Sequence, residues 1–219
     1  MSYPSSIKIH SSTIVDDGAI IGVGTAIWHF SHICSGAVIG KNCSIGQNVL
    51  VADNATLGNG VKIQNNVAIY GGITVEDDVF LGPSCVLTNV TNPRSQVSRK
   101  TLYEKTFIRR GATVGANATI VCGITLGRYC FIGAGAVVTK DVPDYGLVLG
   151  NPSNLSGFMS RHGHKLHFDN SNQAICPESN YRYERAGEEV RCFDLDEDKP
   201  LPDELSVGSK AYDDFKLTK

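Results

Sequence analysis

The sequence lacks the long apolar run that a membrane-spanning helix needs. None of its 219 residues lies in a stretch that approaches about 18 consecutive apolar residues. Its start, MSYPSSIKIH, has neither the basic nor the apolar region of a signal peptide. The net charge is only −2, whereas a nucleic-acid-binding domain is strongly basic. We therefore expect a cytoplasmic protein with no membrane partner and no nucleic-acid partner.

Paired cysteine motifs are missing as well. The seven cysteines are an odd number without regular spacing, which argues against a disulfide framework. Near the C-terminus, His162, His164, Cys176 and Cys192 include no CxxC pair, and structural zinc sites usually contain two such pairs. The sequence thus predicts reduced thiols and no metal.

A six-residue period organises most of the chain. Aliphatic residues occupy every sixth position from Ile9 to Leu87, and again from Ile108 to Val138. A small or β-branched residue follows each of them by four positions, and Gly, Asn or Asp falls between. Neither the 3.6-residue period of a helix nor the alternation of an ordinary strand explains a period of six.

This pattern resembles the hexapeptide repeat of the left-handed parallel β-helix. The resemblance implies that three hexads form one triangular coil, so that residues 18 apart stack on each other. Gly, Asn and Asp suit the corners, where the backbone turns. We expect an all-β protein with four parts, namely a β-helix domain over residues 1–157, a protruding loop inserted at 88–107, a small β annex at 158–193 and a charged C-terminal tail at 194–219.

The period breaks once, and the break coincides with a basic stretch. Leu87 and Ile108 are 21 positions apart where a hexad step needs six, so about 15 residues loop out after Asn89. Residues 88–140 contain eight Lys or Arg and one acid, while residues 1–87 contain three and six. A long loop on a rigid scaffold is usually functional, and a local basic band favours a small polyanionic ligand.

Longer motifs make the resemblance more specific. With the repeat and the loop, VVTKDVPDYGLVLGNPSN resembles the hexapeptide-repeat acyltransferases. Bacterial nucleotide-sugar N-acetyltransferases have segments similar to IWHFSHI, GQNVLV, KIQNNVAIYGG, VEDDVFLGPSCVLTNVTNPRS, RRGATVGANATIVCGITLG and GFMSRHGHKL. The closest resemblance is to enzymes that acetylate the 3-amino group of UDP-2-acetamido-3-amino-2,3-dideoxyglucuronate. It implies acetyl-CoA as co-substrate, a homotrimer with active sites between subunits, and a role in bacterial surface polysaccharide (O-antigen) biosynthesis. The alternatives are an N-acyltransferase for a dTDP-3-amino-deoxyhexose and a non-catalytic hexapeptide scaffold.

Stacking by 18 gathers polar and aromatic residues at one corner, before the loop leaves the β-helix. With residues near the loop, they are the expected nucleotide-sugar site: Trp28, His29, Gln47, Gln64, Asn65, Tyr70, Glu76, Asn89 and Arg94. Arg94 suits a pyrophosphate or a carboxylate, because arginine binds both in bidentate fashion. As alternatives, Trp28 and His29 are surface or subunit contacts, and Arg94 is merely solvated.

Two of these residues are the candidate catalytic groups. Asn89, from the TN element of the resemblance, is expected to orient the amine, although an amide is no strong base; its alternative is a purely structural corner role. His29 is a general base by residue type, but substrate contact is the preferred interpretation. We predict direct attack of the amine in a ternary complex, with little or no protein base and the departing thiolate as proton acceptor.

The acetyl-CoA site is expected on the later coils. Two arginines stack there and face either a coenzyme phosphate or solvent. The small residues Gly115, Gly133 and Ala134 are structural in the first place, and their second expected role is to give the pantetheine arm room to approach. By resemblance, GNP at 150–152 lies near the adenine. The expected contacts are Arg110, Gly115, Ala116, Arg128, Gly133, Ala134, Lys140, Asn151 and Pro152.

Overall fold

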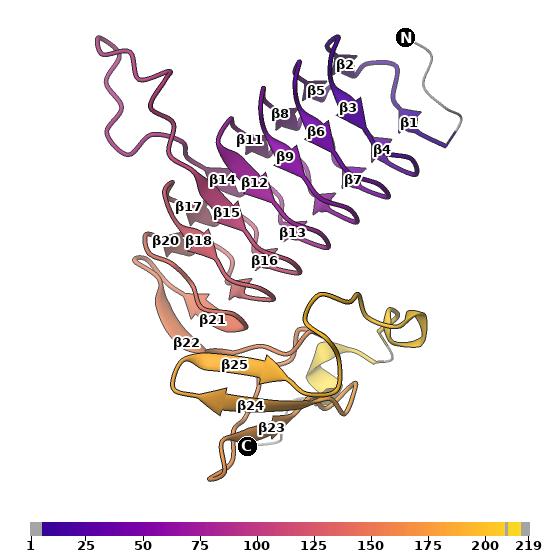
Figure 1. Ribbon diagram of the computed structural model, residues 1–219, viewed down its shortest axis with the longest axis vertical. Helices are drawn as coiled ribbons and strands as arrows, with labels where there is room; N and C mark the ends of the chain where they lie inside the picture. The colour runs from indigo at the N-terminus through magenta and orange to yellow at the C-terminus, as the bar shows by residue number, and fades with distance from the viewer. Residues whose placement is uncertain (1–5, 209, 216–219) are drawn as a thin grey trace.

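The structure, a computed structural model, describes residues 6–208 and 210–215. Its main body is a parallel β-helix whose coils stack along one axis, with a loop projecting from its middle and a smaller sheet at its C-terminal end (Figure 1). Lys8 pairs with Ala26, and Ala26 pairs with Ser44. Residues 18 apart therefore stack, which confirms the register predicted from the sequence.

Three walls form the β-helix, and most of their strands have two residues. The first wall contains β1 (Lys8–Ile9), β4 (Ala26–Ile27), β7 (Ser44–Ile45), β10 (Lys62–Ile63), β13 (Phe80–Leu81), β16 (Thr113–Val114), β19 (Phe131–Ile132) and β21 (Gly146–Leu149). The second contains β2 (Ile14–Val15), β5 (His32–Ile33), β8 (Leu50–Val51) and β11 (Ala68–Ile69), then β14 (Val86–Leu87), β17 (Thr119–Ile120) and β20 (Val137–Val138). The third contains β3 (Ile20–Ile21), β6 (Val38–Ile39), β9 (Thr56–Leu57), β12 (Ile73–Val75), β15 (Thr106–Ile108) and β18 (Thr125–Leu126).

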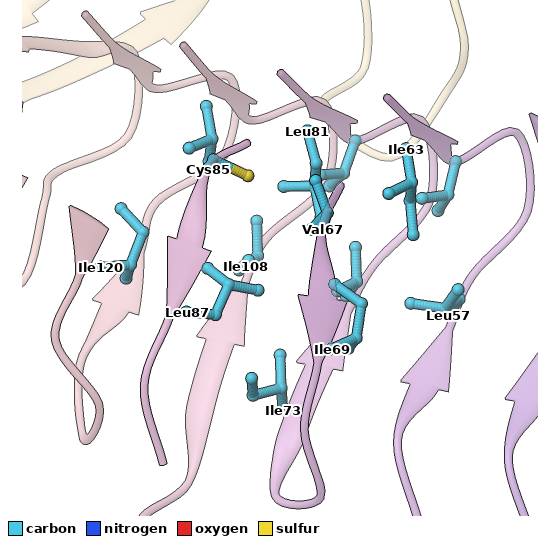
Figure 2. Close-up of a cluster of buried hydrophobic side chains, with 14 of the residues drawn as sticks. Leu57, Ile63, Val67, Ile69, Ile73, Leu81, Cys85, Leu87, Ile108 and Ile120 are labelled. Atoms are coloured by element: carbon cyan, nitrogen blue, oxygen red, sulfur yellow. The ribbon is translucent and has the colours of Figure 1, made fainter. Parts of the chain in front are cut away.

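The aliphatic residues of the six-residue period fill the interior. In the two-residue strands the second residue points inward and the first points outward, so that Ile33, Ile45 and Ile69 are fully buried. Figure 2 shows Ile69, Leu87 and neighbouring aliphatic side chains packed together between the walls. Each such side chain contributes roughly 1.5–3 kcal/mol of burial free energy. The repeat thus builds a continuous core.

The small position of the repeat is also buried. Thr25 donates to Gly40 O at 2.9 Å and accepts from Cys43 N at 3.1 Å, so its hydroxyl links adjacent coils. Cys85 and Cys130 occupy the same inward position. Burial raises the pKa of the Cys85 thiol to about 12 and raises the pKa of the Cys130 thiol further. These cysteines are inert core residues rather than nucleophiles.

Corner residues explain the spacing of Gly, Asn and Asp. One residue per hexad has a left-handed backbone, as in Asn42 (φ 56°) and Asp78 (φ 59°), and Asn, Asp and Gly tolerate that conformation best. Other corners need glycine for space, because a Cβ on Gly40 would lie 2.3 Å from Gly58 O. The sequence turns every six residues for these two reasons.

The loop shifts the register without ending the β-helix. Phe80 pairs with Thr113, which lies 33 rather than 18 positions later, so 15 residues are inserted, as predicted. Beyond Val138, the last periodic residue, β21 still pairs in parallel with β19. The β-helix thus continues by one strand after the sequence period is lost.

A small antiparallel sheet follows the β-helix. After β22 (Asn154–Phe158), which turns back on β21, come β23 (Gln173–Ile175), β24 (Arg182–Ala186), β25 (Glu189–Cys192) and the 3-10 helices η1 (Asp203–Leu205) and η2 (Tyr212–Phe215). The charged segment after β25 packs back on the body, because Tyr129 Oη donates to Glu197 O at 2.5 Å and Tyr145 Oη donates to the Glu197 carboxylate. Within residues 6–208 and 210–215, no helix has the length and apolarity that a bilayer crossing requires.

Candidate active site

Three corners join the walls and divide the candidate residues among them. The tryptophan corner follows the strands of the first wall and includes residues 28–30, 46–48 and 64–66. The loop corner follows the second wall, includes residues 70–72 and carries the inserted loop. The arginine corner follows the third wall and includes residues 76–78 and 109–111. Each corner presents a different chemistry.

The tryptophan corner brings five of the predicted substrate residues together. They line one shallow hollow of about 280 Å³: Trp28, His29, Gln47, Gln64 and Asn65. The His29 ring stacks on His10, with ring centroids 3.5 Å apart, and Trp28 is half exposed. Asn65 also has a structural task, since its Oδ1 accepts from Gln47 N at 2.8 Å. This corner offers flat rings and amides for a planar ligand.

The loop corner places three other predicted residues around a larger hollow. Tyr70, Asn89 and Arg94 line a space of about 720 Å³ beneath the inserted loop, which we call the loop hollow. Its described lining contains no Asp, Glu or His. The only hydrogen bond of Asn89 among the described residues is at its backbone, where its O accepts from Glu104 N at 3.0 Å. The Asn89 side-chain amide is therefore available to a ligand.

Glu104 holds the two ends of the loop together. Besides the bond to Asn89, its carboxylate accepts from Thr91 N at 3.1 Å and from the Thr91 hydroxyl. These hydrogen bonds lower the pKa of the Glu104 carboxyl. Glycine in the next coil makes room for it, since a Cβ on Gly123 would lie 2.6 Å from Glu104 Oε2. The base of the loop, beside Asn89, is therefore held by hydrogen bonds and close packing around Glu104.

The outer part of the loop is a narrow turn rich in cations. Val97 N donates to Arg94 O at 3.1 Å, and Arg99 Nε donates to Asn92 O at 3.0 Å. Arg94, Arg99 and Lys100 all line the loop hollow. Within the part of the chain that the structure describes, none of these three has a carboxylate at ion-pair distance.

The arginine corner has the opposite arrangement, because acids neutralise its cations. Arg110 donates to Asp77 at 2.8 Å and to Asp78 at 3.0 Å. Arg109 Nε lies 2.7 Å from Glu76 Oε1. Desolvation raises the pKa of Asp78, an effect that Arg110 opposes. Glu76, predicted to bind substrate, and Arg110, predicted to bind the coenzyme, are therefore partners of other side chains.

The other predicted coenzyme residues do not form one cluster in a single chain. Arg128 pairs with Asp198 of the C-terminal segment at 3.0 Å. Gly115, Ala116, Gly133 and Ala134 continue the tryptophan corner, Lys140 follows β20, and Asn151 and Pro152 lie between β21 and β22. A Cβ on Gly115 would lie 2.5 Å from Ala134 N, so coil stacking alone requires glycine there.

Sequence reasoning overlooked four residues of the loop. Arg99, Lys100 and Tyr103 line the loop hollow, and Glu104 joins the two ends of the loop next to it. The dibasic pair at 99–100 was visible within the basic band, but no periodic position singled it out. Tyr103 packs over the preceding coil, where a Cβ on Gly71 would lie 3.6 Å from its ring.

No arrangement of potential metal ligands stands out in the annex. His164 is bound to Glu178 at 2.7 Å, and His162 lies 3.0 Å from Leu205 O. Elsewhere in the described residues, Asp16, His32 and Cys34 converge on the β-helix surface. His32 Nε2 lies 3.1 Å from Asp16, and both side chains are about two-fifths exposed (44% and 40%), as in an ordinary surface ion pair. The absence of a metal stays a prediction.

Comparison with known proteins places this geometry in a family. Residues 54–89 and 105–140 match the bacterial transferase hexapeptide (six repeats) family, and residues 36–70 match the hexapeptide repeat of succinyl-transferase. A dTDP-3-amino-3,6-dideoxy-α-D-galactopyranose 3-N-acetyltransferase from Aneurinibacillus thermoaerophilus is 45% identical over 168 residues, covering 77% of this chain and 86% of that protein. The chain belongs to the hexapeptide-repeat nucleotide-sugar N-acetyltransferases. It is therefore an N-acetyltransferase, and its β-helix is the family fold.

Solved acetyltransferase structures align with this chain at lower identity. The acetyltransferase domain of PglB from Neisseria gonorrhoeae, in complex with acetyl coenzyme A, is 23% identical and covers 68% of this chain and 57% of that one, with a TM-score of 0.46. A GDP-perosamine N-acetyltransferase variant from Caulobacter crescentus, in complex with coenzyme A and GDP-perosamine, is 21% identical over 69% and 58% of the chains, with a TM-score of 0.46.

Proposed function

We propose that this N-acetyltransferase transfers the acetyl group of acetyl-CoA to the 3-amino group of UDP-2-acetamido-3-amino-2,3-dideoxyglucuronate, for a bacterial surface polysaccharide. The observation that carries the proposal is the loop hollow, where Asn89 lies among three cations without acidic partners in the described chain. The relative that is 45% identical acetylates a 3-amino group on a nucleotide sugar. A substrate with a sugar carboxylate besides its pyrophosphate suits the excess positive charge.

Asn89 performs the positioning step of this reaction. The amine arrives unprotonated, and Asn89 Oδ1 accepts a hydrogen bond from one of its N–H groups, which aims the nitrogen lone pair at the thioester carbonyl. The C–N bond forms, the C–S bond breaks, and the proton lost by the nitrogen passes to the departing thiolate. Within one chain the described lining of the hollow provides no carboxylate or imidazole as base, which favours a reaction whose rate comes mostly from positioning.

A homotrimer accounts for the division of the candidate residues. In one chain, the rings and amides of the tryptophan corner line one hollow, and Asn89 lines another. A second copy that turns its tryptophan corner toward the loop completes a nucleotide-sugar site between subunits. His29 then contacts substrate rather than acting as base. Sedimentation at micromolar concentration tests this assembly, and a monomer would contradict it.

A dTDP-linked 3-amino-6-deoxyhexose is the second candidate substrate. The relative that is 45% identical supports it, because that protein acetylates a dTDP-linked 3-amino-3,6-dideoxyhexose. The two substrates differ at C5, where the first carries a carboxylate and the second a methyl group. The sugar carboxylate therefore decides between them if the loop cations contact it.

Thiol release from acetyl-CoA tests the proposal directly. The assay compares the UDP-linked 3-amino-glucuronate, its UDP-linked 3-amino-glucose analogue and a dTDP-linked 3-amino-3,6-dideoxyhexose. We expect the highest kcat/KM with the glucuronate and intersecting initial-velocity lines, as in a ternary complex. A higher kcat/KM with the dTDP sugar would select the second candidate, and parallel lines would reject direct attack.

A further inference from the structure

In the described chain, the loop holds the Arg99 guanidinium at one of its three nitrogens. Its Nε donates to Asn92 O at 3.0 Å, which fixes the stem of the guanidinium. Among the residues that the structure describes, Nη1 and Nη2 of Arg99 have no hydrogen-bond acceptor. The side chain is half-buried, unlike the exposed Arg94 and Lys100. A fixed fork of free N–H groups is the donor arrangement that binds carboxylates and phosphates.

The arginines of the arginine corner have different surroundings from Arg99. Arg109, Arg110 and Arg128 each have a carboxylate partner. The loop hollow contains no acidic residue in its described lining, so Arg99 and the adjacent Lys100 add their charges there. Clustered cations without acids repel each other, and a bound anion relieves that repulsion.

The position of this cation pair relates it to the reacting amine. Asn89, Arg99 and Lys100 line the same hollow of about 720 Å³. In the proposed substrate, the 3-amino group and the C5 carboxylate belong to one pyranose ring. The groups that contact them must therefore face one cavity, whereas the pyrophosphate lies outside the ring beyond C1.

We propose that Arg99, with Lys100, forms the binding site for an anionic oxygen group of the nucleotide sugar, and its place beside Asn89 favours the sugar carboxylate over the pyrophosphate. This inference rests on the proposed function and deepens it by naming the specificity-determining residues. Arg99 makes the bidentate contact and Lys100 adds a point charge. A neutral sugar in the same position would leave both cations unpaired.

Equilibrium binding measures the site without requiring catalysis. Isothermal titration with UDP-glucuronate and UDP-glucose compares a carboxylate with a hydroxymethyl group on otherwise equal ligands. For the wild type we expect tighter binding of UDP-glucuronate. Arg99→Gln should weaken UDP-glucuronate binding by about 10-fold to 100-fold, the size of a lost charged hydrogen-bond pair, and leave UDP-glucose within about 2-fold. Arg99→Lys and Lys100→Gln should give intermediate losses.

The results distinguish binding of the sugar carboxylate, binding of the pyrophosphate and the absence of an anion site at Arg99. Equal weakening of both ligands by Arg99→Gln would support an anion site that binds the pyrophosphate. The exposed Arg191 on β25, far along the chain, provides the control, and Arg191→Gln should change neither affinity. Three results would overturn the proposal. They are unchanged affinities in Arg99→Gln, a loss of affinity in Arg191→Gln as large as that in Arg99→Gln, and a wild-type protein that binds neither ligand.

The thiol-release assay on the same preparations separates this inference from the proposed function. Wild-type protein that shows the Arg99-dependent binding but acetylates no 3-amino sugar would reject the function and keep the site. Wild-type protein that acetylates the glucuronate while Arg99→Gln retains its KM would keep the function and reject the site. Lys100→Gln leaves the Arg99 contact to Asn92 intact, so its loss of affinity cannot be ascribed to a displaced loop.

Discussion

The arginine corner and the loop hollow contain cations of the same kind in opposite surroundings. Arg109 and Arg110 contact carboxylates of the preceding coil. Arg94 and Arg99, in contrast, donate hydrogen bonds to backbone oxygens of their own loop and to no other group among the described residues. Both pairs belong to one basic stretch of the sequence. Local charge therefore does not locate a ligand site, because pairing within the fold determines which cations remain available.

Removal of the Asn89 amide should have the largest effect on activity. Asn89→Ala is expected to lower kcat by about 100-fold to 1000-fold, the usual loss for one positioned hydrogen-bonding group, with no change in unfolding free energy. Steady-state kinetics and urea unfolding measure the two quantities. Asn92→Ala, in the same loop, is the matched control and should retain kcat; equal losses in both variants would remove Asn89 from its proposed role.

A methyl group at the loop base should disturb the hollow more than the same change elsewhere. Gly123→Ala places a Cβ against Glu104, while Gly135→Ala meets nothing within 4 Å, and both glycines have positive φ (83° and 70°). We expect a stability loss of about 1–2 kcal/mol from backbone strain in each, a further loss in Gly123→Ala, and a lower kcat only there. Equal kcat values would show that the loop base does not position Asn89.

Neutralising an arginine should affect different quantities at the two locations. Arg110→Gln removes the partner of two partly exposed carboxylates, and we expect a loss of about 1–2 kcal/mol in unfolding free energy with the KM for acetyl-CoA within about 2-fold. Arg94→Gln should leave stability unchanged and raise the KM for the nucleotide sugar. A large rise in the acetyl-CoA KM of Arg110→Gln would restore the phosphate contact predicted from the sequence.

Acid should loosen the loop base through Glu104. Because hydrogen bonds from Thr91 lower its pKa below the ordinary 4.5, its stabilising contribution is complete above pH 4.5 and is lost as the pH falls through the lowered pKa. We expect Glu104→Gln to flatten this part of the stability–pH curve, measured by thermal unfolding. Glu188→Gln, in an exposed turn, is the control, and an identical flattening there would exclude a specific role for Glu104.

Nearly all of the β-helix can be predicted from the sequence, but only part of the candidate site can. Inward positions such as Ile45 and Ile69 follow from the period alone, and counting from Leu87 to Ile108 predicts the size of the inserted loop. The strand β21 lies within the predicted β-helix range of 1–157, but the period does not locate it because Gly146–Leu149 is out of phase with the period. The period and its interruption can be read directly from a single sequence, because they depend only on residues near each other in the repeat.

The partners of the charged residues depend on longer-range geometry. Arg110 meets Asp77 and Asp78 only because the loop shifts the stacking from 18 to 33 residues. Glu104 belongs to no motif, and its importance is visible only once Thr91 and Gly123 surround it. Asn89 was predicted from the resemblance, and its position in the loop hollow is what connects that prediction with chemistry.

A crystal structure with coenzyme A and the UDP-linked 3-amino-glucuronate tests the central claim most directly. It should show the sugar in the loop hollow, with its 3-amino nitrogen at hydrogen-bonding distance from the Asn89 side chain and its carboxylate on Arg99. Density for the sugar at the arginine corner, or in a site that the loop does not touch, would contradict the claim that the loop cations beside Asn89 mark where the amine is acetylated.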